Sequence, residues 1–219
     1  KSELANKNWF KYSLVGLSIF IICLKIFNVS FNSITTEPVV YIVEDEYQIV
    51  FSSNVESRAW VSIVINGEEK RYFDNYNGSN RSDEKIHKVC IPMSVLDEAK
   101  SYEIHVQKVN YRGPFGGFMG RDISASYSFK PVDTTDGFQY YNLSDIHMGT
   151  QASIDAQKHY DYDMLVVAGD IVSMMDTYED ANYVNEIVHE MTKGGKPVVY
   201  ARGNHEIKGE YATKFHRFV

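Results

Sequence analysis

The sequence has little proline, few cysteines and no concentration of positive charge, and each shortage excludes a class of protein. Five prolines among 219 residues, beside 16 tyrosines and 12 phenylalanines, argue against long disordered segments. The formal net charge is −7 and no run of lysine or arginine occurs, so we expect no nucleic-acid partner. No G-x-G-x-x-G sequence follows the first strand of the C-terminal part, which sets a dinucleotide-binding function aside.

The two cysteines, Cys23 and Cys90, stand far apart in stretches of different character. Cys23 lies in the most hydrophobic stretch of the chain, whereas Cys90 lies in an alternating apolar and polar sequence. We therefore expect no disulfide between them. The cellular compartment does not follow from this, because many exported proteins have no disulfides.

The first 32 residues predict a membrane anchor or a signal segment. A mostly apolar run extends from Tyr12 to Val29, near the roughly 20 residues that span a bilayer. Lysines precede this run, and aromatic residues lie where a membrane interface would be. No A-x-A-like cleavage sequence follows, so an uncleaved transmembrane helix is favoured over a cleaved signal peptide and over a buried helix. Either of the first two places the rest of the chain outside the cytoplasm, membrane-anchored or secreted.

Residues 33–132 have the pattern of an all-β domain. Segments that alternate apolar and polar residues recur at short intervals, separated by turn-forming residues. Such segments predict a β-sandwich of the immunoglobulin or fibronectin type III kind. No acid–histidine cluster occurs here, which favours a spacer or packing role. The predicted strands are Glu46–Ser53, Ala59–Gly67, Lys85–Met93, Ser101–Val109 and Ser124–Val132.

Residues 133–219 alternate strand and helix patterns, which predicts a parallel α/β layer. The predicted strands are Gly137–Asp145, Asp163–Asp170 and Pro197–Glu206, with helical segments between them. The chain begins at Lys1 and stops at Val219 without a closing element. We therefore expect a longer parent protein in which this domain continues.

Each of these three apolar strands ends in side chains of metal-binding type. Neighbouring parallel strands bring their carboxyl ends to one edge of a sheet, so the side chains should meet there. Carboxylate oxygens, imidazole nitrogens and amide oxygens are ligands of first-row metal ions. Each strand end alone has an ordinary explanation as a helix cap, a surface histidine or a turn, but three in succession indicate one site. The residues are Asp145 and His147 after the first strand, Asp170 after the second, and Asn204, His205 and Glu206 after the third.

These strand ends resemble the first three signature motifs of the calcineurin-like metallophosphoesterases. The matching sequences are Asp145-x-His147, Gly169-Asp170 and Gly203-Asn204-His205-Glu206. A β-sandwich before such a domain is similar to the arrangement in purple acid phosphatases. The resemblance implies the N-terminal half of a metallophosphoesterase domain. It also implies hydrolysis of a phosphate ester by a metal-activated water at a centre of two divalent or trivalent ions, Fe, Zn or Mn.

The resemblance also implies roles for individual residues. His205 would be the catalytic residue, which holds the phosphate or helps to protonate the leaving oxygen. Glu206 would be either a partner that supports the ligands or a surface residue. The implied metal ligands are Asp145 and His147 on one ion, Asp170 bridging both ions, and Asn204 on the second ion.

Two differences from the family bear on function. Ser173 stands where the purple enzymes have an iron-binding tyrosine, so no iron–tyrosinate bond is expected. No Gly-His-x-His block follows Glu206, and His216 is expected to be an ordinary surface histidine. Residues 1–219 alone are therefore expected to be inactive. The alternative function is a non-catalytic surface-binding module that carries a degenerate phosphoesterase scaffold.

Overall fold

The computed structural model describes residues 9–19, 32–110, 118–147 and 149–218. The chain forms two compact units, Lys1–Phe31 and Asn32–Val219. In the first unit, the described residues form a helix over residues 9–19. Its apolar side chains are exposed, with Trp9 and Tyr12 each 75% accessible.

The predicted transmembrane helix is wrong for the part of the chain that the structure describes. Among those residues, no helix is both long and apolar enough to cross a membrane. The remainder of the predicted span, residues 20–29, lies outside the described residues. The expectation depended on apolar composition, and composition does not fix how many consecutive residues are helical. The membrane partner expected through this segment is therefore not supported.

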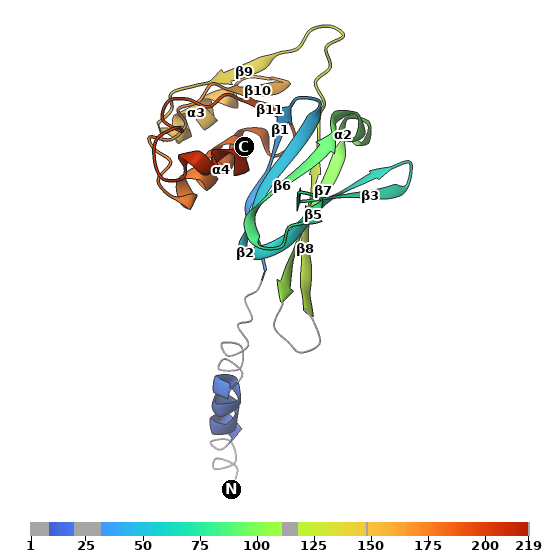
Figure 1. The fold of residues 1–219 in the computed structure, drawn as a ribbon, viewed down its shortest axis with the longest axis vertical. Coiled ribbons are helices and arrows are strands. Elements are labelled where there is room, and N and C mark those ends of the chain that lie inside the picture. The colour runs from blue at the N-terminus through green and yellow to red at the C-terminus, as the bar shows by residue number, and fades with distance from the viewer. Residues whose placement is uncertain (1–8, 20–31, 111–117, 148, 219) are drawn as a thin grey trace. The chain divides into compact units, whose positions relative to one another are not determined.

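The described part of the second unit consists mainly of strands, with a few short helices (Figure 1). The helices are α2 (Met93–Ala99), α3 (Thr150–Gln157), α4 (Tyr178–Thr192) and the 3-10 helix η1 (Ala212–Arg217). The strands are β1 (Ile34–Val43), β2 (Glu46–Ile65), β3 (Glu68–Phe73), β4 (Asn75–Tyr76), β5 (Ser79–Asn80), β6 (Glu84–Pro92), β7 (Ser101–Asn110), β8 (Phe118–Ser128), β9 (Tyr140–Leu143), β10 (Met164–Val167) and β11 (Pro197–Tyr200).

Nine of these strands form one sheet in the order β8-β7-β2-β1-β11-β10-β9, with β3 and β6 also paired with β2. Strand β1 lies between β2, which is antiparallel to it, and β11, which is parallel to it. The β-rich segment and the α/β segment therefore share a continuous sheet.

The predicted separate sandwich of the immunoglobulin or fibronectin type III kind is wrong. Strand β2 is 20 residues long and covers two segments that were expected to be separate strands. Its first part pairs with β1 and β6, its second part pairs with β3 and β7, and the register shifts between Ser52 and Ser57. Alternation predicts which residues form strands, but it does not fix which strands pair, because backbone hydrogen bonds carry no sequence information.

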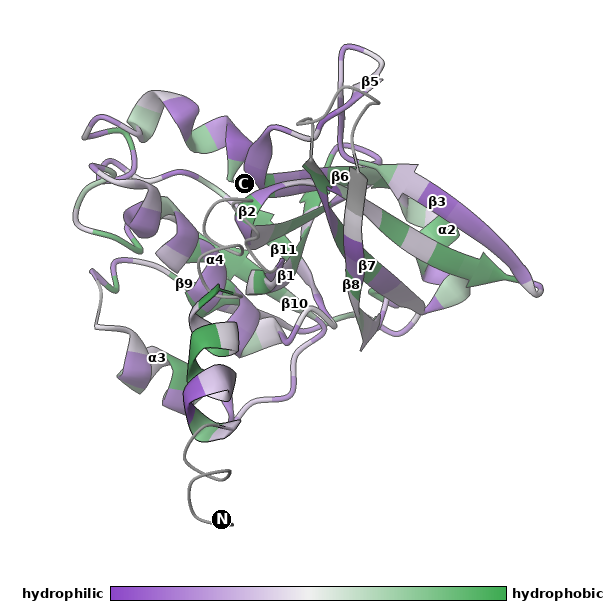
Figure 2. Ribbon diagram, turned by 90° about the horizontal axis from the view of Figure 1, so that it is seen from below, coloured by the Kyte–Doolittle hydropathy of each residue, from purple (hydrophilic) through white to green (hydrophobic). Residues whose placement is uncertain are grey.

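Strand β1 is buried on both faces because its successive side chains point in opposite directions, each into a hydrophobic core. Val39 and Tyr41 pack in a hydrophobic core that contains α4, whereas Val40 packs in a second core that contains Leu96 of α2. Successive side chains of a strand point to opposite faces, so β1 contributes to both cores. The central strands are accordingly apolar, whereas β3 is hydrophilic along much of its length (Figure 2).

Helix α4 docks on β1 through buried hydrogen bonds as well as apolar contacts. The Tyr41 hydroxyl donates to Asn185 Oδ1 at 2.7 Å. The ring nitrogen Nδ1 of buried His189 donates to the Pro38 carbonyl at 2.8 Å. Buried polar groups are costly when unpaired, so these bonds fix how the helix lies on the sheet.

Strands β9, β10 and β11 are parallel and in register, with Val167 beside both Leu143 and Tyr200. These three residues are the last of their strands. The loops that follow therefore leave the sheet at one edge, where ligands bind in open α/β sheets.

Candidate metal centre

Three side chains from the loops after β9, β10 and β11 meet at this edge. His147, Asp170 and His205 offer ligand atoms that all lie within 4.8 Å of one another. Asp170 is buried at 8% accessibility, His205 is half-buried and His147 is exposed. The rings of His147 and His205 meet edge to face, with centroids 4.5 Å apart. The group therefore combines a buried carboxylate with two imidazoles that solvent can reach.

The backbone around these side chains adopts uncommon conformations. Asp145, His147 and Asp170 have φ angles of 55°, 44° and 57°. This left-handed region is unfavourable for residues with a side chain and costs about 1–3 kcal/mol per residue. Hydrogen bonds hold the conformation: Asp145 N donates to the Gly169 carbonyl, and His147 N donates to the Asp170 carbonyl, each at 3.2 Å. The loop after β9 is thus bound to the loop after β10.

Two glycines allow the loops after β10 and β11 to touch. Gly169 has a φ of 78°, and a Cβ there would overlap the backbone of Gly203. A Cβ on Gly203 would in turn overlap the carboxylate and backbone nitrogen of Asp170. Only residues without a side chain fit at both positions, so the glycines bring Asp170 and His205 together.

Replacing Gly169 with alanine is expected to lower the free energy of unfolding by about 1–3 kcal/mol, because the new Cβ meets backbone atoms that cannot rotate away. Chemical denaturation would measure this change. Gly137→Ala is the control, because Gly137 also has a positive φ, 88°, but nothing lies within 4 Å of its Cβ position. An equal loss of stability in both variants would show that glycine is needed at position 169 because of backbone strain, and not because of contact between the loops.

Glu206 joins the two loops from beneath. Its side chain is fully buried, at 0% accessibility. Oε2 accepts hydrogen bonds from the backbone nitrogens of Asp170 at 2.9 Å and Gly203 at 3.0 Å. Oε1 accepts from the backbone nitrogen of Ile171 at 2.7 Å. Glu206 is therefore a buried residue whose carboxylate holds the backbone of the two loops together, and its role in supporting metal ligands stays a prediction.

Tyr200, at the end of β11, completes this buried network and was not anticipated from the sequence. Its hydroxyl donates to Glu206 Oε1 at 3.3 Å. Burial, and next the negative charge of Glu206, raise the pKa of Tyr200 above its ordinary value, so the hydroxyl stays protonated and remains a donor. A tyrosine at the last strand position before A-R-G-N-H-E is the only signal that the sequence offers for this role.

The hydrogen bonds of His205 fix which of its ring nitrogens carries the proton. Nδ1 lies 2.7 Å from the Ser173 carbonyl, which can only accept, so Nδ1 is the protonated nitrogen. The Nε2 lone pair is then available to a ligand. The backbone nitrogen of His205 donates to Asp170 Oδ1 at 2.8 Å. An imidazole oriented by a carbonyl, beside a hydrogen-bonded carboxylate, is a donor set that fits a first-row metal ion.

The other two expected ligands lie in the same loops. Asp145 does not belong to the group of three among the described residues, and its carboxylate accepts a hydrogen bond from the Ser144 hydroxyl. Asn204 is exposed, between Gly203 and His205. Their metal-binding roles therefore stay predictions.

Cys90 is a free exposed cysteine, and Cys23 lies outside the described residues.

The parallel strands and the three converging side chains define a candidate metal-binding site in an α/β segment. Residues 138–219 match the family model of the calcineurin-like phosphoesterases. The match is consistent with the binding of divalent metal ions, and His147, Asp170 and His205 form a candidate group for it. No curated protein matches the chain.

Solved structures also resemble the chain. Purple acid phosphatase PPD1 from yellow lupin (Lupinus luteus) seeds has 12% sequence identity and a TM-score of 0.48, over 80% of this chain and 36% of that one. A bacterial immunoglobulin-like domain from the M. primoryensis ice-binding adhesin has 15% identity and a TM-score of 0.25, over 43% of this chain and 96% of that one. The chain thus spans about a third of the length of the lupin structure.

Proposed function

We propose that this protein is a metal-dependent phosphoesterase that hydrolyses phosphate esters at a centre of two metal ions. The observation that carries the proposal is the convergence of His147, Asp170 and His205 within 4.8 Å at the carboxyl edge of the parallel strands. Metal ions bound there would supply a Lewis acid for the phosphoryl oxygens and an acidified water. Fe, Zn and Mn all suit these ligand types.

Each residue of the site has a different role in this proposal. Asp170 and His147 supply ligand atoms, and the contacts of Glu206 hold the backbone beneath Asp170 in place. His205 Nδ1 faces the Ser173 carbonyl, which leaves Nε2 toward the site: its lone pair would bind a metal ion, whereas an Nε2–H would donate to a phosphoryl oxygen. Asp145 and Asn204 would complete the ligand set in the roles that the family resemblance implies.

Removing metal from the full-length protein should lower its hydrolysis of p-nitrophenyl phosphate by about tenfold or more, since the water would no longer be acidified. The rate is measured before and after dialysis against a chelator, and again after addition of Mn²⁺ or Zn²⁺, which should restore it. Metal analysis of each sample is the control. An unchanged rate in protein shown to be metal-free would contradict the proposal. No hydrolysis in any sample would favour the non-catalytic module.

A further inference from the structure

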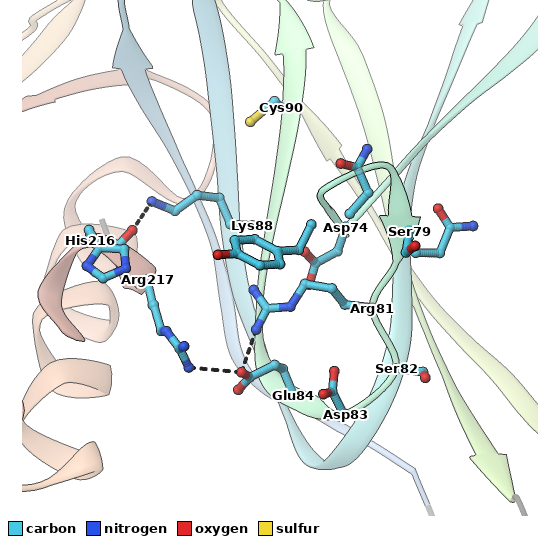
Figure 3. A pocket seen from close by; sticks show the side chains of 13 residues that line it. Asp74, Ser79, Arg81, Ser82, Asp83, Glu84, Lys88, Cys90, His216 and Arg217 are labelled. Atoms are coloured by element: carbon cyan, nitrogen blue, oxygen red, sulfur yellow. Dashed lines mark hydrogen bonds and ion pairs between the residues drawn. The ribbon is translucent and has the colours of Figure 1, made fainter.

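A polar cleft of about 830 Å³ lies between the β4–β5 hairpin, strand β6 and helix η1, all within the second unit. It involves none of the residues of the candidate metal centre. A smaller cavity of about 230 Å³ adjoins it and shares Arg81, Asp83, Glu84 and Arg217. Figure 3 shows Arg217 and Arg81 reaching from opposite sides toward Glu84.

Two arginines share one carboxylate oxygen in this cleft. Glu84 Oε1 lies 2.5 Å from Arg81 Nη2 and 3.0 Å from Arg217 Nη1 (Figure 3). Two guanidinium groups therefore face a single negative charge. A guanidinium group has five N–H donors, and these contacts engage one terminal nitrogen of each arginine. The cluster keeps one net positive charge and donors for a further acceptor.

Lys88 adds a second positive charge from β6. Its ammonium donates to the His216 carbonyl at 2.5 Å, which ties η1 to β6. Burial lowers the pKa of Lys88 to about 8, so the ammonium is desolvated but still mainly charged at neutral pH. A bound anion would stabilise the buried ammonium in place of the water contacts that it has lost.

Of the other two acidic residues of the cleft, Asp74 has a histidine partner and Asp83 faces solvent. Asp74 is buried and pairs with His87 at 3.2 Å. Asp83 is exposed to solvent, where its charge is screened. Glu84 is thus the acid that competes for the two arginines.

We propose that this cleft binds a phosphate group, which inserts between Arg81 and Arg217 and replaces Glu84 as their partner. A phosphate has three terminal oxygens, which suit two guanidinium groups and one ammonium from separate elements of the fold. A carboxylate carries a single negative charge, whereas a phosphate group carries up to two and therefore matches the excess positive charge of the cluster better. The proposal does not depend on the phosphoesterase function, because the cleft and the candidate metal centre have no residue in common.

Calorimetric titration with inorganic phosphate, at low salt and with a chelator present, tests the proposal. Arg217→Gln should weaken binding about tenfold, because it removes charge-assisted hydrogen bonds. Glu84→Gln should strengthen binding about threefold, because it removes the competing carboxylate. Arg71→Gln is the matched control, since Arg71 is an exposed arginine on β3 that pairs with Glu69. Phenyl phosphate, titrated in parallel, distinguishes free phosphate from a phosphate monoester as the ligand.

Opposite effects of Arg217→Gln and Glu84→Gln, with Arg71→Gln unchanged, would support the site. Equal weakening by Arg71→Gln, or weaker binding by Glu84→Gln, would overturn it, as would absence of binding. Amide chemical shifts of the unmodified chain give a second measurement that does not depend on variants. Shifts confined to residues 145–147 and 203–206 would place phosphate at the candidate metal centre and also overturn the proposal.

Discussion

Replacing Asp170 with asparagine is expected to lower hydrolysis of an aryl phosphate by the full-length protein about 10³-fold, the scale of losing one principal electrostatic group of an active site. Asparagine keeps an oxygen that can accept the hydrogen bond from His205 N but lacks the negative charge and the second oxygen with which Asp170 would hold metal ions. The backbone of residue 170 stays bound to Glu206 in the variant. The lower rate of hydrolysis should therefore reflect a slower catalytic step and not unfolding of the protein.

Steady-state rates on p-nitrophenyl phosphate measure this loss, and thermal denaturation checks the fold. Asp136→Asn is the matched control, because Asp136 is exposed in a turn before β9. It should retain the full rate. If Asp170→Asn hydrolysed substrate as fast as Asp136→Asn, Asp170 would have no part in catalysis and the proposed function would fail.

Replacing Glu206 with alanine should lower the free energy of unfolding by about 3–5 kcal/mol, because it leaves buried donors without an acceptor. The donors that lose their partner are the backbone nitrogens of Asp170, Ile171 and Gly203. Glutamine at this position keeps one accepting oxygen and should cost less. Urea denaturation, with the midpoint and slope compared, measures both variants.

Glu210→Ala is the control for this experiment, since Glu210 is exposed in the same loop. It should change stability by less than about 0.5 kcal/mol, as is usual for surface substitutions. A Glu206→Ala variant as stable as Glu210→Ala would show that the buried carboxylate is dispensable, and its positioning role would be wrong.

The position of the candidate site could be predicted from the sequence because strand ends are local features. Apolar runs that stop at Asp145, Asp170 and Asn204 mark the loops, and parallel topology brings such loops to one edge. The inward turn of Glu206 could not be predicted, since a carboxylate after a histidine looks the same whether it faces solvent or backbone donors. Its burial depends on glycine contacts between loops that are remote in sequence.

Strand β1 was not predicted, and the reason is physical. It is buried on both faces around Val39 to Tyr41, so the alternation that marks a half-buried strand is missing. Its register against β2 also shifts between Thr36 and Val39, beside Pro38. Without β1, the sequence suggested a separate sandwich, because nothing in the pattern connected the β-rich segment to β11.

Strand β1 is synthesised well before its parallel neighbour β11, because the two strands are far apart in the sequence. Val40 pairs with Pro197, and contacts between such distant residues form slowly. Until β11 arrives, one side of an apolar strand exposes unpaired amide and carbonyl groups that other nascent chains can capture. Newly made protein is therefore vulnerable to aggregation until β11 pairs with β1. The same pairing brings the loop after β11 beside Asp170.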